Sequence, residues 1–126
     1  MHPEKLKQVL TLSGDERFDY LVRKVADLEE IWGLAYDGWA LSEDDSGQMA
    51  VPVWPEADFA AACATGDWAG MQPKPIALAD FFEKWIPGME RDNRMVAVFP
   101  IPSGRGVFVN PSRLGDALKE EKQQYE

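Results

Sequence analysis

The spacing of apolar side chains changes at Gly33, and this change constrains the fold more than any other feature of the sequence. Over residues 18–32, apolar residues recur every three or four positions, as they do on the buried face of a helix. Ser13 and Glu16 have the spacing of a capping box ahead of this repeat. Around Gly33 the repeat shortens to that of a strand. The sequence therefore predicts a helix over about 14–29 that leads directly into a strand.

Along the whole chain, runs of adjacent strands alternate with helices in the order ααβββα(β)αββα. The expected strands cover residues 31–36, 39–41, 49–54, 75–77, 95–100 and 106–109. The expected helices cover residues 3–12, 14–29, 55–65, 78–85 and 111–118. Adjacent strands mixed with helices predict an α+β fold, with a mostly antiparallel sheet of about four to five strands and helices packed on one face.

Glycine and proline mark the places where these elements turn or break. Asp37-Gly38 favours a hairpin between the first two strands, and residues 101–104 form the expected hairpin loop between the alternating strands 95–100 and 106–109. Pro52 lies inside the third strand and predicts an edge position or a local irregularity, because proline has no amide proton to donate. For the same reason Pro87 predicts that the fourth helix ends or kinks. The segment from the third strand to Ile76 would add one parallel crossover.

The chain of 126 residues has the length of one domain and contains no internal repeat, low-complexity tract or Gly/Ser linker. We therefore expect a single domain over residues 1–126. The first helix, within residues 1–12, is expected to lie at the periphery of this domain. Residues 119–126 are expected to form a frayed tail.

Negative charge is concentrated in the middle of the chain. The formal net charge is −9, and between Lys24 and Lys74 there are ten acidic residues and no lysine or arginine. This balance argues against a nucleic acid partner, because binding a phosphate backbone requires basic side chains. The sequence has no apolar run long enough to span a membrane and no signal peptide, so we expect no membrane association and a cytoplasmic location.

The residues that usually carry catalysis or hold a metal are scarce. Cys63 is the single cysteine and His2 the single histidine, and Cys63 lies between alanines on an expected helix face, where a packed structural role is favoured. Residues 44–47 resemble a fragment of a calcium loop but lack its spaced oxygen ligands and its later glutamate. No phosphate-loop or dinucleotide motif occurs. We expect no enzyme, no catalytic residue, no metal and no cofactor.

Tryptophans next to turns and strand ends alternate with the acidic residues of the same region. Aromatic anchors surrounded by charge are typical of binding surfaces, although packing and solvation would also explain them. The leading hypothesis is a non-enzymatic interaction protein, of the inhibitor or immunity type, that binds a basic protein. The candidate binding residues are Asp37, Trp39, Glu43, Asp44, Asp45, Trp54, Glu56, Asp58, Asp67 and Trp68.

Two alternatives remain open. In the first, the protein is a small-ligand-binding module or weak hydrolase that stacks its ligand on Trp54 or Trp68, with Glu56, Asp58 or Asp67 as the polar groups. In the second, the acidity only keeps the protein soluble.

Several motifs, in this order, resemble those of the domain-of-unknown-function 2750 family, a group of small, mostly bacterial cytoplasmic proteins. The resemblance covers residues 15–120 and implies a single α+β domain. It supplies no activity, substrate or catalytic residue. The motifs that carry it are Ile31-Trp-Gly-Leu34, Asp37-Gly-Trp39, Val51-Pro-Val-Trp-Pro55, Pro75-Ile-Ala-Leu78, Phe81-Phe-Glu-Lys-Trp-Ile-Pro87 and Val96-Ala-Val-Phe-Pro100.

Overall fold

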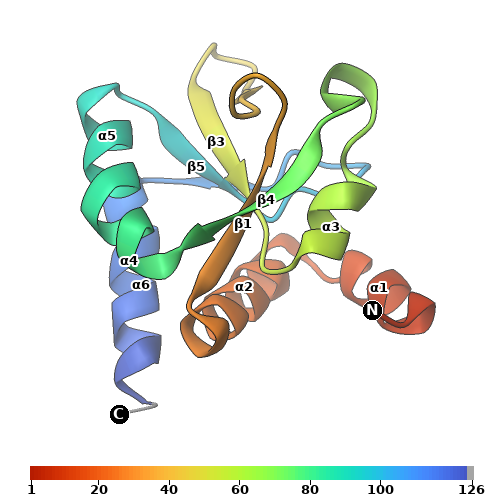
Figure 1. Ribbon diagram of the computed structural model, residues 1–126, viewed down its shortest axis with the longest axis horizontal. Coiled ribbons are helices and arrows are strands. Elements are labelled where there is room, and N and C mark those ends of the chain that lie inside the picture. The colour runs from red at the N-terminus through yellow and green to blue at the C-terminus, as the bar shows by residue number, and fades with distance from the viewer. Residues whose placement is uncertain (125–126) are drawn as a thin grey trace.

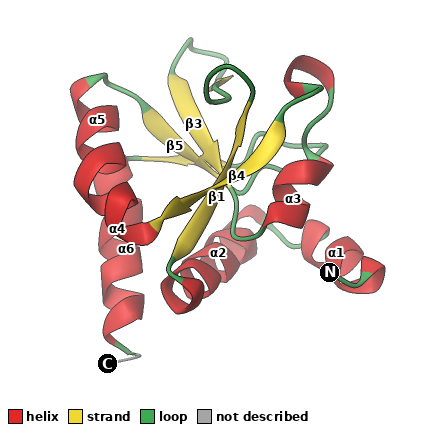
Figure 2. Ribbon diagram, in the orientation of Figure 1, coloured by secondary structure: helices red, strands yellow, loops and turns green. Residues whose placement is uncertain are grey.

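The computed structural model describes residues 1–124 as a single α+β domain, which confirms the predicted fold class (Figures 1 and 2). The helices are α1 (Pro3–Leu10), α2 (Gly14–Leu28), α3 (Ala57–Ala62), α4 (Leu78–Asp80), α5 (Ile86–Arg91) and α6 (Pro111–Gln123), with a 3-10 turn at Gly66–Trp68 and a π-helical turn at Phe81–Trp85. The strands are β1 (Glu30–Ala35), β2 (Ser42–Glu43), β3 (Met49–Val53), β4 (Gln72–Ala77), β5 (Met95–Val98) and β6 (Val107–Val109).

The strands form two sheets rather than the one expected. Strands β1 and β4 pair antiparallel, and a second sheet has the order β2-β3-β5-β6. Within the second sheet only β3 and β5 are parallel. A bridge between Trp32 and Trp54 joins the two sheets, so β4, β1, β3, β5 and β6 form a nearly continuous surface. The predicted hairpin of the last two strands is confirmed, with Val96 opposite Val109.

One edge of β3 is shared by two partners, and Pro52 lies between them. Strand β2 pairs with β3 at Ala50, and β1 meets the same edge at Trp54. The backbone N–H and C=O groups of successive residues point to opposite edges of a strand. The nitrogen of Pro52 therefore points to the edge that β2 and β1 share, in the gap between them. Strand β3 lies inside its sheet, so the predicted edge position is wrong. The missing amide proton of Pro52 falls where no ladder bond forms.

Strand β4 is longer than expected and has a different partner. It covers residues 72–77 and pairs antiparallel with β1, with Lys74 opposite Gly33. The predicted crossover into Ile76 is therefore wrong, and the parallel neighbour of β3 is β5. The amide of Leu78 donates to Glu29. Because backbone amides alternate in direction along a strand and that of Leu78 points to β1, the nitrogens of Pro73 and Pro75 point away from β1. Two prolines are therefore accommodated in one strand.

The hairpin expected at Asp37-Gly38 is reduced to a tight turn. Asp37 adopts a left-handed backbone with φ 52°, and Ala35 forms a single bridge with Trp39. Residues 39–41 do not form a strand, and the chain next pairs at residues 42–43. Strand β1 takes β4 as its partner instead, because β4 offers a six-residue ladder.

The helices lie where they are predicted but differ in detail, and α3 covers only Ala57–Ala62 of the expected 55–65. The capping box of α2 forms, with the Ser13 hydroxyl accepting from the Glu16 amide at 3.2 Å, but Leu28 at its end is 54% exposed and does not belong to the buried face. The helix that contains Pro87 does not end there. It widens into the π-helical turn, where the Ile86 amide donates to Phe81, and then continues as α5. The wider turn accommodates a ring that an α-helical turn excludes.

Both ends of the chain are helical. Helix α1 lies at the outer edge of the molecule, as expected, with Val9 buried (Figure 1). Helix α6 extends to Gln123, so residues 119–123 are not the frayed tail predicted, whereas residues 125–126 lie outside the described residues. Helix α6 packs against α2. No helix in residues 1–124 is both long and apolar enough to cross a bilayer.

Candidate functional site

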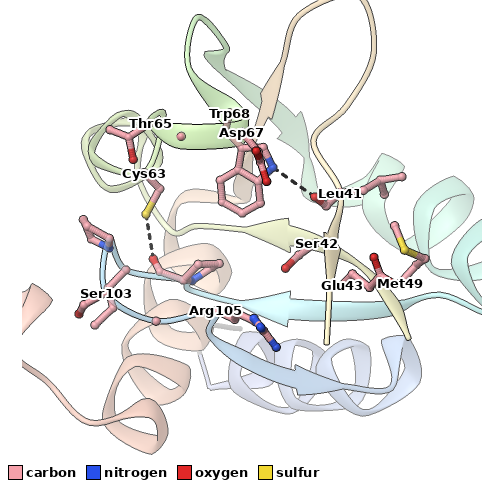
Figure 3. Close-up of a pocket in the computed structure, with 15 residues that line it drawn as sticks. Leu41, Ser42, Glu43, Met49, Cys63, Thr65, Asp67, Trp68, Ser103 and Arg105 are labelled. Carbon is pink, nitrogen blue, oxygen red and sulfur yellow. Dashed lines mark hydrogen bonds between the residues drawn. The ribbon is translucent and has the colours of Figure 1, made fainter. Parts of the chain in front are cut away.

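A hollow with a volume of about 710 Å³ lies among three separate segments (Figure 3). Residues 41–43 lead into β2, residues 63–68 follow α3, and residues 100–105 connect β5 to β6. We call this hollow the three-segment pocket. Its walls come together only through the tertiary fold, because they are about 20 to 60 residues apart in sequence.

Polar contacts join the second wall to the other two and the third wall to the neighbouring turn. The Trp68 indole Nε1 donates to the Leu41 carbonyl at 3.1 Å, which joins the first wall to the second. The Cys63 thiol donates to the Pro100 carbonyl at 3.3 Å, which joins the second to the third. Arg105 forms an ion pair with Asp45 at 3.0 Å, which joins the third to the β2 turn. The pocket is therefore preformed, and a ligand would not have to assemble it.

Cys63 is 4% exposed and forms part of the pocket floor. Burial raises the pKa of its thiol to about 11. The sulfur is therefore protonated near neutral pH and is a poor nucleophile. This agrees with the structural role predicted from the sequence.

The charged side chains of the pocket are Glu43, Asp67 and Arg105. The Arg105 guanidinium is already balanced by Asp45. Glu43 and Asp67 are exposed and form no ion pair with any residue in 1–124. The pocket therefore carries an excess of negative charge beside the half-buried Trp68 ring (Figure 3).

Of the ten candidate binding residues, the structure places Glu43, Asp67 and Trp68 in the pocket wall, and Asp45 beside it through Arg105. Asp44 stabilises the adjoining turn. Its carboxylate accepts hydrogen bonds from the hydroxyl and amide of Ser46 and from the amide of Gln48. These hydrogen bonds, first that of the Ser46 side chain, lower the pKa of Asp44.

Trp54 is fully buried, and its assignment as a contact residue is wrong. Its indole nitrogen donates to the Pro100 carbonyl at 2.9 Å, and its ring meets Trp68 edge-on at 5.9 Å. Trp54 therefore supports the pocket from behind. Trp39 packs edge-on against Trp85 at 4.7 Å, outside the pocket, with Lys74 over its ring.

The remaining candidates also lie outside the pocket wall. Asp37 occupies its tight turn. Glu56 accepts from the Tyr20 hydroxyl at 2.9 Å, and Asp58 pairs with the amino terminus of Met1 at 3.0 Å. The acidic residues thus lie at several separate places. Some are balanced by cations from the terminal segments, as with Lys122 and Glu29.

Sequence reasoning missed the third wall of the pocket, residues 101–105, which it assigned only to a hairpin loop. It also missed Arg17, which is buried in α2 and donates to the carbonyls of Phe99 and Leu12. One signal was available, because Arg17 precedes Leu21 by four residues and so shares its helix face. No group of three or more potential metal ligands converges within residues 1–124.

A family model described as a protein of unknown function, DUF2750, matches residues 18–118. The chain belongs to this family. No curated protein and no solved structure matches it.

Proposed function

We propose that the protein is a non-enzymatic, cytoplasmic binding module and that the three-segment pocket holds a small ligand. The observation that carries this proposal is the joining of the walls by Trp68–Leu41 and Cys63–Pro100, with the exposed ion pair Asp45–Arg105 beside them. A hollow held in shape by its own contacts loses little conformational entropy when a ligand enters.

The side chains favour a ligand that has a flat apolar part and a positive charge. The Trp68 nitrogen is already bonded to Leu41 and its ring meets Trp54 at 5.9 Å, so the ring surface that these contacts leave open is the part available for stacking and for cation–π contact. Glu43 and Asp67 supply carboxylates that no other described side chain neutralises. An amine or guanidinium on a small aromatic or aliphatic frame matches both features.

The test compares matched probes by NMR, following the indole N–H signals of the five tryptophans. Benzylamine and phenylguanidine carry the favoured charge, benzyl alcohol is a neutral counterpart, and benzoate carries the opposite charge. We expect the two cations to shift the Trp68 signal in a saturable way and to raise the melting temperature, because a ligand stabilises the state it binds. Benzoate should shift it least.

Two isosteric variants locate the binding. Glu43→Gln and Asp67→Asn remove charge from the pocket, whereas Glu120→Gln and Asp116→Asn make the same changes on exposed positions of α6. The pocket variants should weaken cation binding by about tenfold each, and the α6 variants should leave it unchanged. If none of a broad set of cationic, neutral and anionic compounds shifts Trp68, the pocket is not a ligand site.

A second candidate is the binding of a basic protein, for which the net charge of −9 and the uncompensated acids at the pocket supply the support. The separation of the acidic residues limits such a surface to the neighbourhood of Glu43 and Asp67. Affinity capture from the source cell at low and high salt, with the double variant Glu43→Gln/Asp67→Asn as control, tests it. A partner that binds both proteins equally would contradict this docking site.

A further inference from the structure

The backbone turns sharply at Phe99, directly behind the three-segment pocket. Phe99 adopts a left-handed conformation with φ 53° although it is a bulky residue and precedes Pro100. Both features disfavour this conformation, because a side chain at positive φ crowds the backbone and a following proline restricts the residue before it to extended geometry. Such strain persists only where the surroundings hold it.

Three contacts hold Phe99 in place. Its amide donates to the Val53 carbonyl at 2.9 Å. Its ring is fully buried and packs against Phe59 and Tyr20, with centroids 4.9 and 6.1 Å away. Its carbonyl accepts from Arg17 Nε at 3.0 Å. Each part of the residue thus has a partner.

The turn determines where the next carbonyl points. The Pro100 oxygen is directed inward and accepts from both Trp54 Nε1, at 2.9 Å, and the Cys63 thiol, at 3.3 Å. From this point the chain forms the third wall of the pocket and returns to β6 through Gly106. The direction of one peptide therefore sets the position of residues 101–105.

Arg17 is a costly residue to place here. Its side chain is 7% exposed, and no carboxylate within residues 1–124 forms an ion pair with it. Its partners are two backbone carbonyls, Phe99 at 3.0 Å and Leu12 at 2.7 Å. A buried charge without a counter-charge is unfavourable compared with an apolar side chain of similar size. An apolar side chain of that size has no N–H groups, so it could not bond the two carbonyls that Arg17 holds.

We infer that Arg17 is a positioning residue for the three-segment pocket, which it shapes from behind by holding the Phe99 carbonyl and so directing Pro100 into the wall. This inference rests on the proposed function only for what the pocket binds. The effect of Arg17 on the position of the third wall can be tested without any ligand.

The test uses the reactivity of Cys63, whose thiol is bonded to Pro100 in the intact wall. The folded protein is mixed with the disulfide dithiobis(nitrobenzoate) at pH 8. The Cys63 thiolate attacks this disulfide, forms a mixed disulfide and releases one equivalent of thionitrobenzoate, whose appearance is followed over time. Arg17→Met removes both donated hydrogen bonds, and Arg17→Lys keeps the charge without the planar fork. Leu118→Ala is the control, because it opens a cavity in α6, outside the pocket wall.

We expect Arg17→Met to react about tenfold or more faster than Leu118→Ala when the two are compared at equal unfolding free energy. Arg17→Lys should react at a rate between those of Arg17→Met and Leu118→Ala. The rate in Arg17→Met should depend little on low urea concentrations, as expected for local opening. Should Arg17→Met fail to fold, Arg17→Lys decides by the same comparison.

Equal rates for the arginine variants and Leu118→Ala at equal stability would show that Arg17 only contributes to stability and would overturn the inference. This outcome is independent of ligand binding. If no probe binds the pocket but Cys63 reacts faster in the arginine variants than in Leu118→Ala, the positioning role is supported and the proposed function is contradicted.

Discussion

Trp32 and Trp54 exchange two backbone hydrogen bonds, 2.9 Å from the amide of Trp32 and 2.8 Å from that of Trp54. This pair joins the β1–β4 sheet to the four-stranded sheet. It also fixes Trp54 at the end of β3, from which the indole reaches Pro100 behind the pocket. The junction of the sheets and the support of the pocket therefore depend on the same residue.

Trp54→Phe tests that support. The substitution keeps an aromatic ring in the core but removes the hydrogen bond from Nε1 to the buried Pro100 carbonyl. We expect the free energy of unfolding in urea to fall by about 1–3 kcal/mol. Trp85→Phe, at a half-buried position, is the control and should cost less. Equal losses at the two positions would show that the bond to Pro100 contributes nothing measurable.

Gly106→Ala tests the close return of the loop. A Cβ at this position would lie 2.7 Å from the Val98 carbonyl oxygen and 2.9 Å from the Pro100 nitrogen. Gly70→Ala is a matched control, because its φ of 87° is close to the 85° of Gly106 while nothing lies within 4 Å of its added Cβ. We expect the control to cost about 1–2 kcal/mol through backbone strain. Gly106→Ala should cost about 1–3 kcal/mol more in thermal or urea unfolding.

Cys63 makes stability depend on pH in the alkaline range. Burial raises its pKa from 9.0 to about 11, so the folded protein binds the thiol proton more tightly than the unfolded chain does. The stabilisation is complete below pH 9 and is lost as the pH rises toward 11. Between these values the wild type should lose about 2–3 kcal/mol more unfolding free energy than Cys63→Ala. Parallel pH profiles of the two proteins would contradict this.

Ser13→Ala tests the start of α2. The hydroxyl accepts from the Glu16 amide, and the Glu16 carboxylate accepts from the Ser13 amide at 3.0 Å. Loss of the cap should lower the free energy of unfolding by about 1 kcal/mol. Ser112→Ala, exposed in the first turn of α6, is the control and should have little effect.

Elements specified by neighbouring residues could be predicted from the sequence. The cap at Ser13 fixed the start of α2, and the alternation on both sides of residues 101–104 gave the β5–β6 hairpin. The first partner of β1 was predicted wrongly, because the Asp37-Gly38 turn suggested a local hairpin, whereas a strand about 40 residues away offers the longer ladder. Long-range pairing leaves no local signal.

The candidate site could be predicted only in part, for a similar reason. Glu43, Asp67 and Trp68 were selected by their residue types and lie in one pocket. Trp54 has the same type and a similar local setting, but the fold buries it completely. Arg105 pairs with Asp45, and Arg17 donates to Phe99. Both partners lie 60 or more positions away, and spacing along the chain does not reveal such contacts.

The two prolines of β4 have a consequence for contacts with other chains. In the described residues no strand covers the outer side of β4, which is where exposed sheets recruit further chains. Pro73 and Pro75 have no amide proton, so two carbonyls of an incoming peptide would have no donor on this edge. The peptide therefore could not form a continuous ladder with β4. The two prolines therefore make the outer edge of β4 a poor template for aggregation.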